Sequence, residues 1–286
     1  MLTLDEFMVV RMRRLTQILL VSAVLSFSGV ANSLASAFIE KPHIQVRLVT
    51  AVEALAVGGD AFVALDLQPE EGWHVYWRNP GDSGMPPKLT WQLPGGLTAS
   101  EPLWPAPHNI PFGPLVNYGY ERVMLPVQLS LAKDFSGKQV SLNLHASWLV
   151  CKELCIPGSA ELNLTLPVAE KVSVSSHSRL ISSALAKVPK KLALMGGSLS
   201  AEGDYIEFTL YTRNPIFAEV EQLVFFPLNE QLVMASDQTE FFWKNNMLRI
   251  RQRKAEDFYR LPRDVGGIII LDGQSAWEFR FERSVE

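Results

Sequence analysis

The sequence has only two cysteines among its 286 residues, and it has no excess of basic side chains. Lysine and arginine total 26 against 30 aspartates and glutamates, a formal net charge of −4, which does not indicate nucleic-acid binding. Beyond the N-terminal segment, no stretch approaches the roughly 20 continuous apolar residues of a transmembrane helix. No serine, histidine and acid constellation, phosphate-binding loop or carboxylate pair stands out. The two cysteines therefore become the main candidates for chemistry.

The N-terminal segment is typical of an export signal. A basic region with three arginines lies at residues 11–14, an apolar segment follows at residues 18–30, and Ala35-Ser36-Ala37 matches a cleavage site. We expect cleavage after Ala37, which makes residues 1–37 a signal peptide. The alternative is a membrane anchor, but the apolar run is short and rich in serine. The mature chain is then expected in an oxidising compartment, where a disulfide persists.

Three residues separate Cys151 from Cys155. In an extended strand their Cα atoms would lie about 12 Å apart, whereas a disulfide requires roughly 4.4–6.8 Å. The flanking segments, residues 140–150 and 162–166, alternate apolar and polar side chains as half-buried strands do. The pattern predicts a hairpin whose loop is Lys152-Glu153-Leu154 and whose opposed positions suit a disulfide. Cys151 falls on the polar side of the alternation, so we expect a partner to reach it.

Three roles for the cysteine pair follow from the residues. A structural disulfide is one, but closing so short a loop removes little entropy from the unfolded chain. Metal binding is a second, because His145 lies six residues before Cys151 and shares its face by parity, so a copper(I) site of Cys151, Cys155 and His145 is conceivable. The short loop favours the third role, an exchanging redox pair without a cofactor.

The remaining chain is dominated by strand patterns. Proline and glycine are dense between residues 86 and 114, which predicts a long loop with three large aromatic residues that acts as a lid or binding loop. Residues 179–188 have helical spacing before a proline. We predict an all-β protein of two sandwich domains at residues 38–168 and 191–286, joined by a linker with one short helix at residues 169–190. The second domain has no cysteine. The strands are expected at residues 43–52, 61–67, 73–78, 122–131, 205–211, 223–226, 239–243, 247–251, 267–271 and 276–281.

Three stretches together carry a family resemblance. They are Gly72-Trp73-His74-Val75-Tyr76-Trp77-Arg78-Asn79-Pro80-Gly81-Asp82-Ser83-Gly84, Asn117-Tyr118-Gly119-Tyr120 and Trp148-Leu149-Val150-Cys151-Lys152-Glu153-Leu154-Cys155-Ile156-Pro157-Gly158. From about Phe38 to Pro167, the chain resembles the periplasmic N-terminal domain of transmembrane thiol:disulfide reductases of the DsbD type. It resembles in particular the ScsB branch, which is linked to copper tolerance, and the resemblance continues more loosely through the second β domain.

The resemblance implies an immunoglobulin-like fold and a periplasmic location. It also implies that Cys151 and Cys155 exchange disulfides with thioredoxin-like periplasmic proteins, one cysteine forming the mixed disulfide and the other resolving it. The resemblance does not assign these two roles, and we take Cys155 as the attacked sulfur. By the same matching, Phe112 is the aromatic residue that shields the cysteines, and Tyr76 lies near them. Lys152 favours a thiolate by its charge, but Glu153 beside it opposes this, so we expect no net pKa shift.

Family members with full activity also carry a multi-helix membrane domain and a thioredoxin-like domain, which this sequence lacks. We therefore expect either a separate membrane electron-transfer protein or a freestanding adaptor with another donor. The expected function is a protein-disulfide reductase-type relay between thiol oxidoreductases. The alternative is a non-enzymatic module that binds copper(I) or another protein and keeps a static disulfide.

Overall fold

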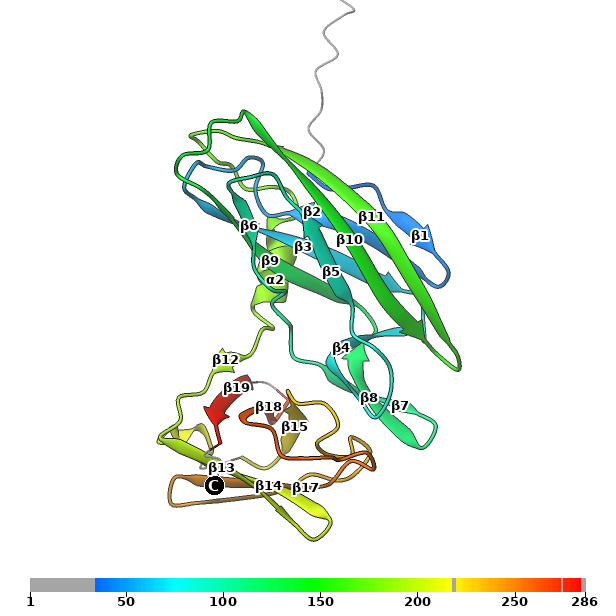
Figure 1. Cartoon of the computed structure of the whole chain (residues 1–286), viewed down its shortest axis with the longest axis vertical. Coiled ribbons are helices and arrows are strands. Elements are labelled where there is room, and N and C mark those ends of the chain that lie inside the picture. The colour runs from blue at the N-terminus through cyan, green and yellow to red at the C-terminus, as the bar shows by residue number, and fades with distance from the viewer. Residues whose placement is uncertain (1–33, 218–219, 274, 284–286) are drawn as a thin grey trace, which may run out of the picture. The chain divides into compact units, whose positions relative to one another are not determined.

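The computed structural model describes residues 34–217, 220–273 and 275–283 (Figure 1). Residues 1–33, which make up most of the predicted signal peptide, lie outside the described residues. Next to the predicted cleavage site, the Ser36 amide donates to the carbonyl of Leu48 at 2.8 Å and Ala35 forms a bridge with Val49. Among the helices of the described residues, none has the length and apolar character needed to cross a membrane.

Two sheets share one core in the first half of the chain, and we call them together the first sandwich. Alternating apolar side chains from both sheets meet in this core, as the period-2 pattern requires. One sheet has the order β1 (Ile39–Lys41), β2 (Ile44–Thr50), β3 (Asp60–Pro69), β9 (Val123–Leu131) and β6 (Leu97–Ala99). The other has the order β11 (Cys155–Pro167), β10 (Gln139–Cys151), β4 (His74–Gly81), β8 (Leu115–Tyr120) and β7 (His108–Phe112), and β5 (Lys88–Gln92) also pairs with β10.

Two further sheets form the second sandwich, whose strands run from yellow to red in Figure 1. Its core is rich in phenylalanine: Phe208 packs edge-on against Phe225, with ring centroids 4.8 Å apart. One sheet has the order β12 (Lys190–Lys191), β19 (Ser275–Glu282), β18 (Asp264–Leu271) and β15 (Leu223–Pro227). The other has the order β13 (Gly196–Glu202), β14 (Tyr205–Tyr211), β17 (Met247–Arg253) and β16 (Glu240–Lys244), and a short 3-10 turn covers Pro215–Phe217.

A single α-helix of the described residues, α2 (Ser178–Leu185), lies between the strands of the two sandwiches in sequence. It buries Ile181 and Ala184, and Ile181 packs with Val49 and Ala64 of the first sandwich. The helical spacing of residues 179–188 therefore predicted this helix correctly. The all-β prediction is confirmed as well.

The prediction of one long loop between residues 86 and 114 is wrong. The segment contains the short strands β5, β6 and β7, which pair with β10, β9 and β8 respectively. Proline removes a hydrogen-bond donor, but it is tolerated at strand ends and on edge strands. Pro111 lies in β7, at the edge of its sheet, so proline density alone did not exclude strands here.

Candidate functional site

The hairpin of β10 and β11 brings the cysteines together. Its register runs without a break from Gln139 opposite Pro167 to Cys151 opposite Cys155, and Figure 1 shows the two strands side by side. The two sulfurs form a disulfide of 2.07 Å, and the Cα atoms lie 4.2 Å apart. Residues 152–154 form the connecting loop, as the alternation of the flanking segments predicted.

The two cysteines differ sharply in exposure. Cys155 is exposed, whereas Cys151 has 0% of its surface accessible. The expectation that a partner reaches Cys151 is therefore wrong. The polar side of β10 is covered at its end, because β4 pairs there and places His74 opposite Cys151. Of the two sulfurs, the one on the edge strand β11 is the one open to attack.

Tyr76 contacts the disulfide directly. Its hydroxyl donates to Cys151 Sγ at 2.9 Å and lies 3.6 Å from Cys155 Sγ. The side chain is fully buried, and burial raises the pKa of Tyr76 to about 12. The hydroxyl therefore stays protonated at neutral pH and remains a donor. A sulfur that leaves as a thiolate accepts a much stronger hydrogen bond than a disulfide sulfur does.

Sequence reasoning did not include His74 among the site residues. His74 is buried directly opposite Cys151, with its ring centroid 5.2 Å from Tyr76 and 6.4 Å from Phe112, both edge-on. Within the described part of the chain, its Nε2 atom has no hydrogen-bond partner, and burial lowers the pKa of His74. The signal was available, because His74 shares the parity of Tyr76 along the strand.

Phe112 ends β7, opposite Leu115 in the tight hairpin of β7 and β8. It is partly buried, and its contact with His74 places it at the site. The predicted shielding residue is thus carried by a hairpin and not by an irregular loop. Its gating role stays a prediction.

Lys152 and Glu153 are exposed in the loop of the cysteine hairpin. The Lys152 amide donates to the carbonyl of Leu154 at 3.1 Å, which closes the loop. Leu154 is 58% exposed directly before Cys155. The exposed Cys155 therefore follows an apolar side chain, Leu154, and lies within three residues of a lysine and a glutamate.

The structure does not bring His145 to the cysteines. His145 lies six residues before Cys151 on one strand, a separation of about 20 Å at the usual rise. Its Nδ1 atom is 2.6 Å from Glu161 on the neighbouring strand. Among the described residues, no group of three histidine, cysteine, aspartate or glutamate side chains is placed to hold a metal ion.

Residues 45–167 match the family described as thiol:disulfide interchange protein DsbD, N-terminal. The structure is similar to the crystal structure of the N-terminal periplasmic domain of ScsB from Proteus mirabilis, with a TM-score of 0.65 and 19% sequence identity. That match covers 88% of this chain and 99% of the other, and at this identity it shows the fold alone.

Other solved structures are much less similar to this chain. Domains 5–6 of the S-layer protein SbsC are 9% identical with a TM-score of 0.23, covering 87% of this chain and 100% of that one. The tandem Ig repeats of Dlar are 12% identical with a TM-score of 0.19, covering 89% and 100%. No curated protein sequence matches this chain.

Proposed function

We propose, on the premise that residues 45–167 form a domain of the DsbD N-terminal type, that this protein relays reducing equivalents between thiol oxidoreductases. The relay works through reversible opening of the Cys151–Cys155 disulfide. One observation carries the proposal: an exposed cysteine, Cys155, is bonded to a buried cysteine, Cys151, whose sulfur accepts a hydrogen bond from Tyr76. A static disulfide needs neither this asymmetry nor a proton donor aimed at one sulfur.

The reaction begins when a thiolate of a reduced donor attacks Cys155 Sγ. The S–S bond breaks, a mixed disulfide forms at Cys155, and Cys151 leaves as a thiolate stabilised by the Tyr76 hydroxyl. The second cysteine of the donor, as a thiolate, then attacks the donor sulfur that is bonded to Cys155. The mixed disulfide breaks and Cys155 is released as a thiolate. The donor is oxidised to a disulfide, and both cysteines of this protein are reduced.

Delivery to an acceptor reverses these steps. The Cys155 thiolate attacks the acceptor disulfide and one acceptor sulfur leaves as a thiolate. The Cys151 thiolate, stabilised by the Tyr76 hydroxyl, then attacks Cys155 Sγ, which re-forms the intramolecular disulfide and releases the reduced acceptor. Phe112 would gate both directions, because it covers the His74 side of the pair.

We also propose the exchange partners, the cellular location and the domain boundaries of this protein. Thioredoxin-like periplasmic proteins would be the exchange partners, and a separate membrane protein would supply electrons. Residues 1–37 would be removed on export, leaving domains at residues 38–168 and 191–286 with a linker at residues 169–190. The family match supports a periplasmic location and thioredoxin-like partners at this general level.

The deciding measurement is the reduction potential of the purified protein, equilibrated with glutathione or dithiothreitol and read by thiol trapping. We expect a value of roughly −120 to −270 mV, the range of thiol oxidoreductases. A value below about −300 mV marks a structural disulfide and would exclude the relay.

Serine variants assign the two roles. Cys151→Ser should accumulate a mixed disulfide with an oxidised thioredoxin-like protein, because the Cys155 thiolate still attacks the disulfide of the partner and the resolving sulfur is missing. Cys155→Ser should form none, because the remaining sulfur is buried. Equal trapping by both variants would contradict the assignment of Cys155 as the attacked sulfur.

The alternative is a binding module for copper(I) or for another protein with an unchanging disulfide. Copper(I) titration of the reduced wild type, Cys151→Ser and His145→Ala tests it directly. Copper binding that is lost in both variants would favour this alternative, although His145 lies far along the strand from the cysteines.

A further inference from the structure

A turn of four residues, Gly81 to Gly84, packs against Tyr76 (we call it the 81–84 turn). Gly84 faces the Tyr76 ring so closely that a Cβ atom there would lie 2.0 Å from ring atom Cε1. Its φ of +103° also favours glycine. The turn therefore forms one wall of the space that holds the Tyr76 ring.

Asn117 on β8 links the same turn to the Tyr76 hydroxyl. This side chain is fully buried: its Nδ2 atom donates to Tyr76 Oη at 3.4 Å, and its Oδ1 atom accepts the Ser83 hydroxyl at 2.8 Å. Gly81 pairs with Asn117 along the main chain. The turn thus fixes both the ring of Tyr76 and the amide group that contacts its hydroxyl.

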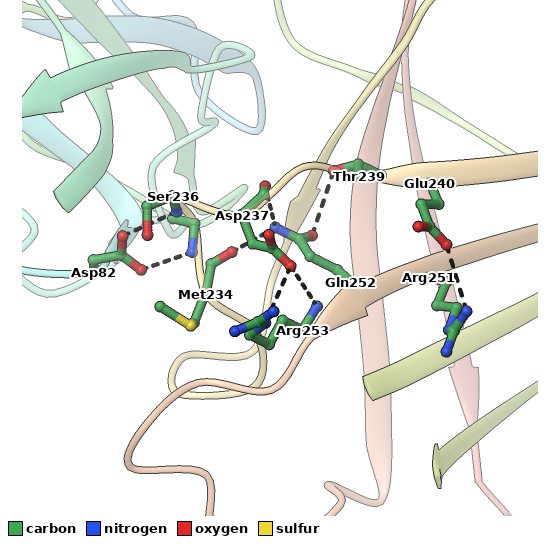
Figure 2. Close-up of polar contacts among 10 residues, drawn as sticks. Asp82, Met234, Ser236, Asp237, Thr239, Glu240, Arg251, Gln252 and Arg253 are labelled. Carbon is green, nitrogen blue, oxygen red and sulfur yellow. Dashed lines mark hydrogen bonds and ion pairs between the residues drawn. The ribbon is translucent and has the colours of Figure 1, made fainter. Parts of the chain in front are cut away.

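Asp82 in the turn is held by the second sandwich. Its carboxylate accepts the backbone amides of Ala235 at 2.7 Å and Ser236 at 3.0 Å. Figure 2 shows Asp82 beside Ser236, with dashed lines for these hydrogen bonds. The same carboxylate accepts the amide of Val116 on β8 at 3.0 Å. One side chain therefore joins the turn, the strand that carries Asn117 and the second sandwich.

The receiving segment is itself anchored. Gln252 of β17 donates to the carbonyl of Met234 at 2.6 Å, and Asp237 accepts the amide of Arg253 at 3.3 Å (Figure 2). Both partners belong to β17 in the second sandwich. The position of Asp82 is consequently tied to a strand of that sandwich and not to a free loop.

Further contacts join the same regions within one compact unit of the chain. Asn79 on β4 donates to the carbonyls of Pro227 at 2.8 Å and Asn229 at 3.2 Å. Phe226 packs edge-on against Tyr118 of β8, with centroids 4.9 Å apart. These contacts lie on the two strands, β4 and β8, that carry Tyr76 and Asn117.

We propose that the second sandwich positions the redox pair: by binding Asp82 it fixes the 81–84 turn, which holds the Tyr76 hydroxyl on Cys151. This inference rests on the proposed function, since positioning matters only if Cys151 becomes a thiolate. A hydrogen bond to a thiolate depends steeply on distance and angle. The second sandwich, which has no cysteine of its own, thereby acts on the chemistry of the first.

The first step of the test measures how much the hydroxyl contributes. Tyr76→Phe removes the donor to Cys151, so the reduced form loses stability relative to the disulfide. We expect the equilibrium constant for reduction by glutathione to fall about tenfold, which is about 30 mV toward more negative potential for this two-electron couple.

The second step asks whether Asp82 acts through that hydroxyl. Asp82→Asn replaces an accepting oxygen by an NH2 group and should lower the same constant about threefold, or about 14 mV. Added to Tyr76→Phe, it should have almost no further effect, because the group it positions is already absent. A wild-type constant in Asp82→Asn, or full additivity in the double variant, would overturn the proposal.

Two variants separate positioning from general loss of stability. Asp272→Asn is the matched control, because Asp272 accepts the amides of Glu221 at 3.2 Å and Gln222 at 2.9 Å in the second sandwich, away from the turn. It should leave the constant unchanged. Gly84→Ala should lower the constant by pushing the Tyr76 ring, without touching the second sandwich. If Asp82→Asn does not fold, an unchanged constant in Gly84→Ala would itself overturn the proposal.

Failure of the proposed function has a different signature. A wild-type potential below about −300 mV excludes the relay. In that case the equilibrium constants for reduction of the wild type, Asp82→Asn, Tyr76→Phe and the double variant can still be compared. Their ratios still decide whether Asp82 acts through Tyr76.

Discussion

At the scale of single residues, burial favours the neutral forms of the His74 and Tyr76 side chains. Both side chains are held neutral beside Cys151, because desolvation lowers the pKa of the histidine and raises that of the tyrosine. The uncharged disulfide is therefore surrounded by uncharged side chains. When Cys151 leaves as a thiolate, the Tyr76 hydroxyl stabilises its negative charge by donating a hydrogen bond.

The first residue-scale prediction concerns acid stability. Because the pKa of His74 is lower in the folded state than the ordinary 6.5, the unfolded state takes up the proton first as the pH falls. The contribution of His74 to stability is present above pH 6.5 and is lost as the pH falls toward the folded-state pKa. We expect His74→Gln to flatten the decline in the urea-unfolding free energy below pH 6.5.

His177→Gln supplies the comparison for that experiment. Burial also lowers the pKa of His177, which precedes α2 and lies outside the site. His177→Gln should also flatten the decline in the unfolding free energy below pH 6.5, but it should leave the reduction potential unchanged. An unaltered pH slope in His74→Gln would contradict the assignment.

At the scale of elements, we predict that the hairpin of β7 and β8 limits access to the hairpin that carries the cysteines. Its tip contacts the site through Phe112, whose ring meets His74 edge-on. An edge-on aromatic contact contributes about 0.5–1.5 kcal/mol, which is small enough for the hairpin tip to open transiently.

The element-scale prediction follows from that contact. Phe112→Ala should increase the rate of disulfide reduction by dithiothreitol about 2- to 10-fold, the rate equivalent of one such aromatic contact. Leu115→Ala is the matched control, because Leu115 opposes Phe112 in the same turn and has no ring to place on His74. Equal acceleration in both variants would indicate a general loosening of the hairpin and not a specific lid.

At the scale of the whole molecule, neighbouring residues of one strand serve the cores of both sandwiches. Phe225 on β15 packs with Phe208 and Phe279 in the second sandwich. Phe226 points the other way, is 1% exposed, and belongs to the core of the first sandwich with Trp77 and Tyr118. This alternation couples the stabilities of the two halves.

The whole-molecule prediction compares those two phenylalanines. Truncating a buried phenylalanine costs roughly 3–5 kcal/mol, so both Phe225→Ala and Phe226→Ala should lower stability. Phe226→Ala should also separate the unfolding of the two sandwiches into two calorimetric transitions, because it removes the ring that packs on Trp77 and Tyr118 of the first sandwich. A single transition in Phe226→Ala, matching that of Phe225→Ala, would contradict the coupling.

Features that depend on local pattern could be predicted from the amino-acid sequence alone. Period-2 alternation and the three-residue spacing predicted the hairpin, its loop and the meeting of Cys151 with Cys155. Parity along β4 also placed Tyr76 away from the face of Trp77, because adjacent strand residues point to opposite sides. The helical spacing before α2 was equally readable.

Which of these residues are buried could not be predicted in this way, because burial depends on strands that are distant in sequence. Cys151 lies on the polar side of its own strand, yet β4 buries it. His145 shares the parity of Cys151, but rise along the strand separates them. The role of Asp82 depends on amides more than 150 residues away in sequence, and no local pattern carries information over that separation.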